Sequence, residues 1–114
     1  MNTDQKLQQI VDKLLVKTQD NLCVWKKNKD NKFIYITPIA TIELYYEVII
    51  GGTSKIKLEI NRDNTTLIEI FQDVNDINFD YHNLVRLFNE VEQYHQNYVN
   101  TFLDKMIVEI QKEF

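Results

Sequence analysis

The residues of this chain that most often bind metals or act as nucleophiles are two histidines and one cysteine. His82 and His95 lie thirteen residues apart in a segment with helical spacing, about three and a half turns, so they cannot share a metal ion without other ligands. Cys23 stands between Leu22 and Val24, a setting typical of a small buried side chain rather than of a nucleophile. The sequence has no H-E-x-x-H or paired C-x-x-C motif. We therefore expect neither a metal site nor thiol chemistry.

Glutamates are the second group that could do chemistry. Glu43, Glu47 and Glu59 alternate with apolar residues, which places them on the solvent side of a half-buried sheet. Two of them could face each other as an acid–base pair, but the sequence indicates no polar pocket that would raise one pKa. Gly51 and Gly52 lie between two strands, which predicts a hairpin turn and not a phosphate-binding loop. We expect no catalytic residue, no bound cofactor and no enzyme activity.

A lysine-rich segment between two aromatic residues, 25–33, has a net charge of +3. Such a segment resembles a small surface that stacks bases and neutralises phosphates of a single strand. The alternative, which we favour, is a solvated turn that discourages edge pairing, with Trp25 in the core. The residues that would contact nucleic acid in the first interpretation are Lys26, Lys27, Lys29 and Lys32.

Residues 41–80 carry the opposite charge, with eight acids against three bases. An acidic sheet face could bind a basic protein, through Glu43, Glu47 and Glu59, or mimic nucleic acid. Dedicated mimics are expected to be much more acidic, so we favour protein binding.

The elements that position these residues begin with a sheet. Apolar residues recur at every second position in three runs of residues 41–73, which predicts antiparallel strands joined by turns at Gly51-Gly52 and at 61–64. In this prediction the first of these strands runs from Thr41 to Ile50. Residues 22–25 and 32–37 predict two further short strands, separated from the long ones by Pro38.

Helical patterns lie at both ends of the chain. Thr3-Asp4 can cap a first helix, whose apolar stripe includes Leu7, Val11 and Leu14. A second pattern follows a connector at 74–79 and a cap at Asp80, and a continuous helix over 81–114 would be about 50 Å long. Because a domain of this length has a radius of gyration of about 13 Å, either the helix bends near 95–97 or its distal part packs on a second copy.

The second half of this helix has more apolar residues than one small sheet and the first helix can bury. Interface cores favour aromatic residues and methionine, so we expect a partner or a second copy to bind here. The predicted partner-binding residues are Tyr94, Tyr98, Phe102, Met106 and Ile110, with Val99, Leu103 and Ile107 widening the stripe.

Length and composition are consistent with one α+β domain over residues 1–114: an N-terminal helix, a four- to five-stranded antiparallel meander and a long, straight or kinked C-terminal helix on one face. The net charge of −4 argues against a dedicated nucleic-acid surface. The chain has no apolar run near the ~20 residues of a membrane span, no signal-peptide pattern and a single cysteine. We expect it to be cytoplasmic and not to bind membranes.

Three short segments carry a resemblance to other proteins. The first helix has Leu14-Leu15-Val16-Lys17-Thr18 ahead of Trp25, a central strand is formed by residues 56–61, and residues 84–88 have a Leu-x-x-Leu-Phe sequence. In this order of parts the chain resembles a loose group of small, mostly uncharacterised bacterial and phage proteins. It departs from them where Asp63-Asn64 replaces the usual Asp-Gly or Asn-Gly. The resemblance implies an α-meander-α fold and a low-GC bacterial or phage source, and it supplies no catalytic residue.

The function that we expect is non-catalytic protein binding, as an accessory or inhibitor of the immunity, antitoxin or defence-associated type, in a homodimer. The defence-related role rests on analogy with small standalone proteins of this kind. The alternatives are a nucleic-acid binder or mimic that inhibits host defence, and a secretion-type chaperone. The sequence leaves the identity of the partner open.

Overall fold

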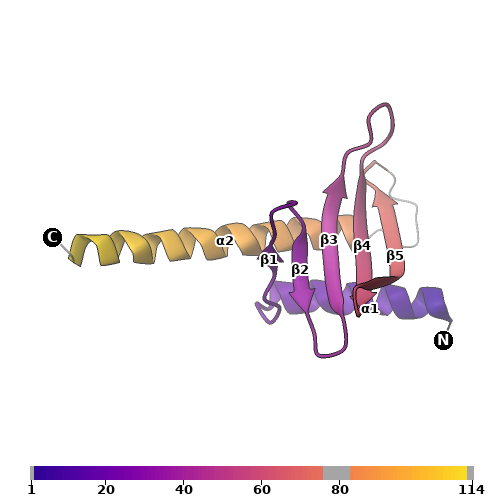
Figure 1. Cartoon of the computed structure of the whole chain (residues 1–114), viewed down its shortest axis with the longest axis horizontal. Helices are drawn as coiled ribbons and strands as arrows, with labels where there is room; N and C mark the ends of the chain where they lie inside the picture. The colour runs from indigo at the N-terminus through magenta and orange to yellow at the C-terminus, as the bar shows by residue number, and fades with distance from the viewer. Residues whose placement is uncertain (1, 76–82, 113–114) are drawn as a thin grey trace.

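The computed structural model describes residues 2–75 and 83–112 and has an α+β fold (Figure 1). Helix α1 (Thr3–Gln19) precedes a five-stranded antiparallel sheet, and helix α2 (Asn83–Lys112) follows it. The strands are β1 (Lys26–Lys27), β2 (Phe33–Ile36), β3 (Thr41–Glu47), β4 (Lys55–Arg62) and β5 (Thr65–Asp73), and they lie in chain order in the sheet. Both helices lie on one face of the sheet, and α2 extends well beyond it. The predicted meander between two helices is confirmed.

Side-chain alternation explains the core. Ile42 and Leu44 of β3 and Ile56 and Leu58 of β4 point to the helices and are buried. They pack with residues of the two helices, which on α1 are Leu7, Val11, Leu14 and Leu15 and on α2 are Leu84, Leu87 and Val91. The turn predicted at 61–64 is confirmed in its second half, since β4 continues to Arg62 and only Asp63 (φ 53°) and Asn64 (φ 64°) link it to β5, with left-handed backbone angles that Asp and Asn tolerate.

Two predicted boundaries of the strands are wrong. Residues 22–25 are not a strand, and β1 comprises Lys26 and Lys27, which pair with Ile34 and Phe33. Continuing this register would place Leu22 opposite Pro38, where the chain already turns, with the Thr37 amide donating to the Ala40 carbonyl. Likewise, β3 ends at Glu47 and not at Ile50. The following loop protrudes past the helices and Ile50 is fully exposed, so burial does not stabilise a longer strand.

The cap of α1 also differs from the prediction. Asn2, not Thr3-Asp4, caps the helix: its side chain accepts a hydrogen bond from the Gln5 amide (2.8 Å), and the Gln5 side chain accepts one from the Asn2 amide (3.0 Å). This reciprocal pair satisfies two amides that the helix start leaves without partners. After Asp20 the chain leaves the helix through Asn21, which has φ 58°.

Helix α2 is hydrogen-bonded to the body near its beginning and packs on it as far as His95. The Val85 amide donates to the buried Gln72 side chain of β5 (3.1 Å), and the Asn83 side chain donates to Asp12 of α1 (2.6 Å). From there α2 is one uninterrupted helix, without the bend considered near 95–97 (Figure 1). It gives the molecule extents of 59 × 37 × 27 Å and a radius of gyration of 16.3 Å. The expected connector at 74–79 lies only partly in the described residues; the cap at Asp80, a helix start at 81 and its end at 114 lie outside them, as does His82.

Candidate functional site

The most unusual surface of the molecule is the distal part of α2, residues 96–112, which we call the distal segment. Every residue from 100 to 112 is exposed, and Figure 1 shows this part of α2 projecting past the sheet. Its large apolar side chains each expose between 40% and 61% of their surface. They are Tyr98, Phe102, Leu103, Met106, Ile107, Val108 and Ile110. This is the overhang that the length of the helix predicted.

The exposed apolar residues form a defined stripe. The seam of this stripe is formed by Val99, Leu103, Met106 and Ile110, which are separated by four, three and four residues and so lie within about 60° of one another around the helix. Phe102 and Ile107 flank this seam, as e and g residues flank the core of a coiled coil. Val108 is about 180° from Val99 and lies on the opposite side of the helix.

The five predicted partner-binding residues do not form one straight row. They recur every four residues, so each is rotated about 40° from the one before. Tyr94 packs against the edge of the core, and burial raises the pKa of its hydroxyl. Tyr98, Phe102, Met106 and Ile110 are all exposed. Val99 and Leu103, which the prediction treated as secondary, are at the centre of the stripe.

At its base the stripe continues into a groove between α2 and the β1–β2 hairpin. This basal groove has a volume of about 390 Å³ and is lined by Lys27, Phe33, Glu92, His95, Gln96, Val99 and Asn100. Its floor is aromatic, since the Phe33 and His95 rings lie 5.6 Å apart, and outside the groove Phe33 also contacts Phe88 (5.7 Å). The Lys27 ammonium group lies 5.3 Å from the centre of the Phe33 ring. The groove therefore combines an aromatic floor with one cation, Lys27, and one carboxylate, Glu92, in its lining.

His95 is the titratable group on this floor. Burial, and to a lesser extent the nearby charge of Lys27, lowers the pKa of its imidazole. Its Nδ1 is buried without a hydrogen-bond partner among the described residues. The neutral imidazole consequently fits this apolar setting better than the charged one does. From the sequence, His95 is expected to be a surface or core-edge histidine rather than a metal ligand, and nothing local indicates that it meets Phe33 and Lys27.

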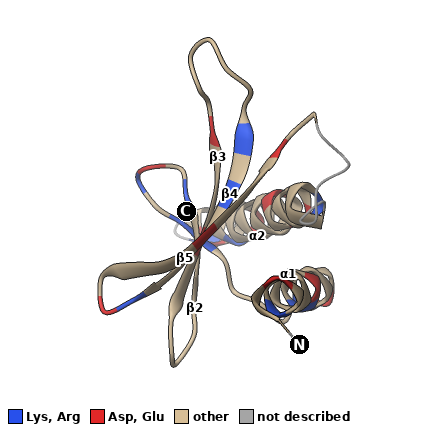
Figure 2. Cartoon of the chain, turned by 90° about the vertical axis from the view of Figure 1, so that its right-hand side faces the viewer, with Lys and Arg blue, Asp and Glu red and all other residues tan. Residues whose placement is uncertain are grey.

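The outer sheet face brings the predicted glutamates together. Glu43, Glu59 and Glu69 are directly opposite one another on β3, β4 and β5. Neighbouring groups compensate much of their charge: Lys57 contacts Glu47 (3.0 Å) and Glu69 (2.8 Å), and Figure 2 shows basic segments of β4 beside acidic ones of β3. These two carboxylates raise the pKa of Lys57, Glu69 more than Glu47. The face is a mixed charge network rather than a purely acidic surface.

Tyr45 is the aromatic centre of this network. Its hydroxyl donates a 2.7 Å hydrogen bond to Glu59, and the Lys32 ammonium lies 4.4 Å from its ring centre and 3.9 Å from Glu43. Burial, followed by the hydrogen bond to Glu59, raises the pKa of the Tyr45 hydroxyl. The two groups with raised pKa values, the Tyr45 hydroxyl and the Lys57 ammonium group, each contact a carboxylate on a neighbouring strand.

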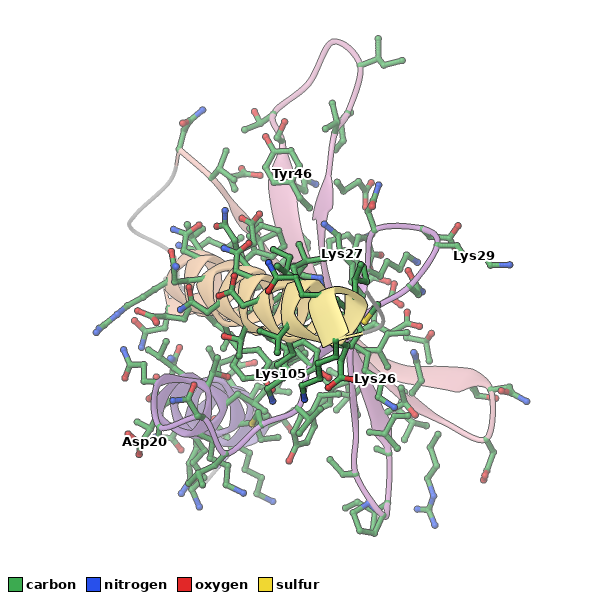
Figure 3. All side chains as sticks on the ribbon, turned by 90° about the vertical axis from the view of Figure 1, so that its left-hand side faces the viewer. Asp20, Lys26, Lys27, Lys29, Tyr46 and Lys105 are labelled. Atoms are coloured by element: carbon green, nitrogen blue, oxygen red, sulfur yellow. The ribbon has the colours of Figure 1, made fainter. Side chains whose placement is uncertain are left out.

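The four lysines of the possible nucleic-acid surface do not point one way. Figure 3 shows Lys26, Lys27 and Lys29 separated around the end view, and Lys32 lies over Tyr45 on the outer sheet face. Trp25 is 3% exposed and donates its indole N–H to Thr18 (3.0 Å), so it is part of the core and not a stacking platform.

Other chemistry has little support in the part of the chain that the structure describes. Within residues 2–75 and 83–112, no three His, Cys, Asp or Glu side chains are placed to hold a metal ion together. Cys23 is buried, and this burial raises the pKa of its thiol. Neither described helix is long and apolar enough to cross a membrane. No protein-family model, curated protein or solved structure matches the chain.

Proposed function

We propose that this chain is a non-catalytic protein-binding module, an accessory or inhibitor, whose distal segment is the binding surface. The observation that carries the proposal is the apolar stripe of residues 99–110 on a helix that has left the body of its own chain. Residues 100–112 are thirteen consecutive exposed positions, and an isolated helix of about this length is marginal in water even when its sequence favours helix. Contact with another protein would stabilise a segment of this length and cover its apolar side chains.

The size of the stripe fits a protein interface. Six half-exposed side chains on the stripe and its flanks, at roughly 100 Å² each, present roughly 600 Å² of surface. A standard interface buries about 800 Å² on each partner, so the stripe supplies most of one, and the basal groove extends it. An exposed patch of this size on a small soluble protein is typical of a binding site.

The charge of the distal segment favours protein over nucleic acid. Asp104 and Glu109 balance Lys105 and Lys112, and the whole chain has a net charge of −4. A nucleic-acid surface needs an excess of lysine and arginine to neutralise phosphates, which this helix lacks. The outer sheet face, with Glu43, Glu47 and Glu59 among exposed Leu67 and Phe71, is a second surface that a protein partner could contact.

Affinity capture with matched variants tests this proposal. The wild type, Leu103→Glu/Met106→Glu and Val108→Glu would each be tagged and expressed in the source cells beside an untagged copy. We expect a protein, either the untagged copy or another chain, to be retained by the wild type and by Val108→Glu and lost by the double variant. Retention of the same proteins by all three chains, or of no protein by any, would refute the proposal.

A further inference from the structure

We propose that the partner of the distal segment is a second copy of this chain: the two distal segments pair antiparallel, and each ends over the basal groove of the other. This inference rests on the proposed function and names the partner of the same surface. The groove is then completed by a helix end that the second copy supplies.

The spacing of the stripe is self-complementary. In an antiparallel pair, a residue at an a position packs against one at a d position of the other helix. With Leu103 against Met106 of the second copy, Val99 falls against Ile110 of the second copy, and the reverse contacts follow from two-fold symmetry. All four seam residues then have an apolar partner. The two-fold axis passes between positions 104 and 105.

Charge does not oppose this pairing. The charges of the distal segment sum to zero, and Asp104 and Lys105, next to the axis, lie on the side of the helix away from the seam. The flanking positions hold Phe102 and Ile107, which add apolar area instead of like charges. Two chains with a net charge of −4 each could therefore approach through this surface with little repulsion.

The length of the distal segment and the position of the basal groove determine where each helix ends in the pair. The distal segment spans about 25 Å, and in this register residue 112 of one copy lies level with residue 97 of the other. The helix end would stop beside Lys27 and His95. Because the sheet lies at one end of α2 (Figure 1), the two sheets would lie at opposite ends of the pair. The carbonyl end of a helix has a partial negative charge, which the Lys27 ammonium complements.

The area also fits a dimer. Two stripes of roughly 600 Å² and the two grooves bring the total to roughly 1,200–1,600 Å², within the range of stable interfaces. The stripe and the basal groove share Val99, so one bound helix can contact both. A second copy uses both features at once.

The first experiment measures mass in solution by light scattering, on the full chain at concentrations from micromolar to several hundred micromolar. We expect twice 13.7 kDa for the wild type and Val108→Glu, and a single chain for Leu103→Glu/Met106→Glu. Fluorescence of Trp25, which is buried in the core, checks that each variant is folded. A monomeric wild type, or equal loss of dimer in both variants, would overturn the inference.

A second experiment tests the direction of the helices by cysteine crosslinking. Val99→Cys and Ile110→Cys are made separately and mixed under mild oxidation, and the wild type, with buried Cys23, is the background control. Antiparallel pairing predicts that crosslinks between the two variants outnumber those within either one at least tenfold. Predominant Ile110→Cys homodimers, or no crosslink above the background, would overturn the antiparallel arrangement.

The two proposals can fail separately. A monomeric wild type that still retains a different protein through Leu103 and Met106 removes the second copy and leaves protein binding intact. A dimer that is indifferent to the double variant removes the second copy as the partner of this surface, and it removes the proposed function too if no other protein is lost by the double variant in the capture experiment.

Discussion

The hydrogen bond between Thr18 and Trp25 makes a measurable contribution to the stability of the body that supports the distal segment. Thr18 is 2% exposed; its hydroxyl donates to the Leu14 carbonyl (2.7 Å) and accepts from the Trp25 indole N–H (3.0 Å). Thr18→Val keeps the volume and removes the acceptor, so the indole N–H is left buried without a partner. Such a group costs about 1–3 kcal/mol.

We expect the free energy of unfolding in urea to fall by about 1–3 kcal/mol in Thr18→Val, with the slope against urea unchanged. The matched control is Thr66→Val on the exposed edge strand β5, which should change stability by less than about 0.5 kcal/mol. In a Trp25→Phe background the same Thr18→Val change should cost clearly less, because the indole donor is already gone. Equal losses in the two backgrounds, or a Thr18→Val loss no greater than that of Thr66→Val, would refute this reasoning.

Three further predictions concern the charged groups. The pKa values of Tyr45 and Lys57 are raised in the folded state, so the stability that these groups contribute is complete below their unfolded pKa values of about 10 and 10.4 and is lost as pH rises toward the folded values. Tyr45→Phe should therefore flatten the fall of the free energy of unfolding between about pH 9.5 and 11.5. An unchanged slope would count against the contact of Tyr45 with Glu59. The pKa of His95 is lowered in the folded state, so the free energy of unfolding should fall as pH drops below about 6.5. Between pH 7 and pH 5, chemical denaturation should show a smaller decrease of this free energy in His95→Gln than in the wild type. Identical decreases would contradict the assignment of the pH dependence to His95. Lys27→Glu should raise the dimer dissociation constant, measured by sedimentation, about two- to fivefold, whereas Lys26→Glu should leave it unchanged. Equal effects of the two substitutions would argue against a helix end in the basal groove.

Alternation and helix spacing were enough to predict the order of the elements, because the core uses them directly. Ile42, Leu44, Ile56 and Leu58 follow a strict period of two, and Asp63-Asn64 is a turn by its chemistry. The errors lie where tertiary contacts outweigh local pattern: residues 22–25 have no strand opposite them in the described part of the chain, and β3 stops where its apolar residues would no longer be covered.

The candidate site was predictable only in part. Helix length against domain size predicted an overhang, but the choice between a bend and a projection needed coordinates. The basal groove could not be foreseen, since Lys27, Phe33 and His95 come from three distant elements. The compensation of the acidic face also depends on register, which places Lys57 within reach of both Glu47 and Glu69.

Amide hydrogen exchange along α2, followed by mass spectrometry as the protein is diluted, tests the central claim most directly. If the distal segments cover each other, protection over residues 98–110 should be high at several hundred micromolar, decline on dilution, and be low throughout in Leu103→Glu/Met106→Glu, while residues 84–91 stay protected in every sample. Protection of residues 98–110 that is the same at all concentrations and in the variant would contradict the account.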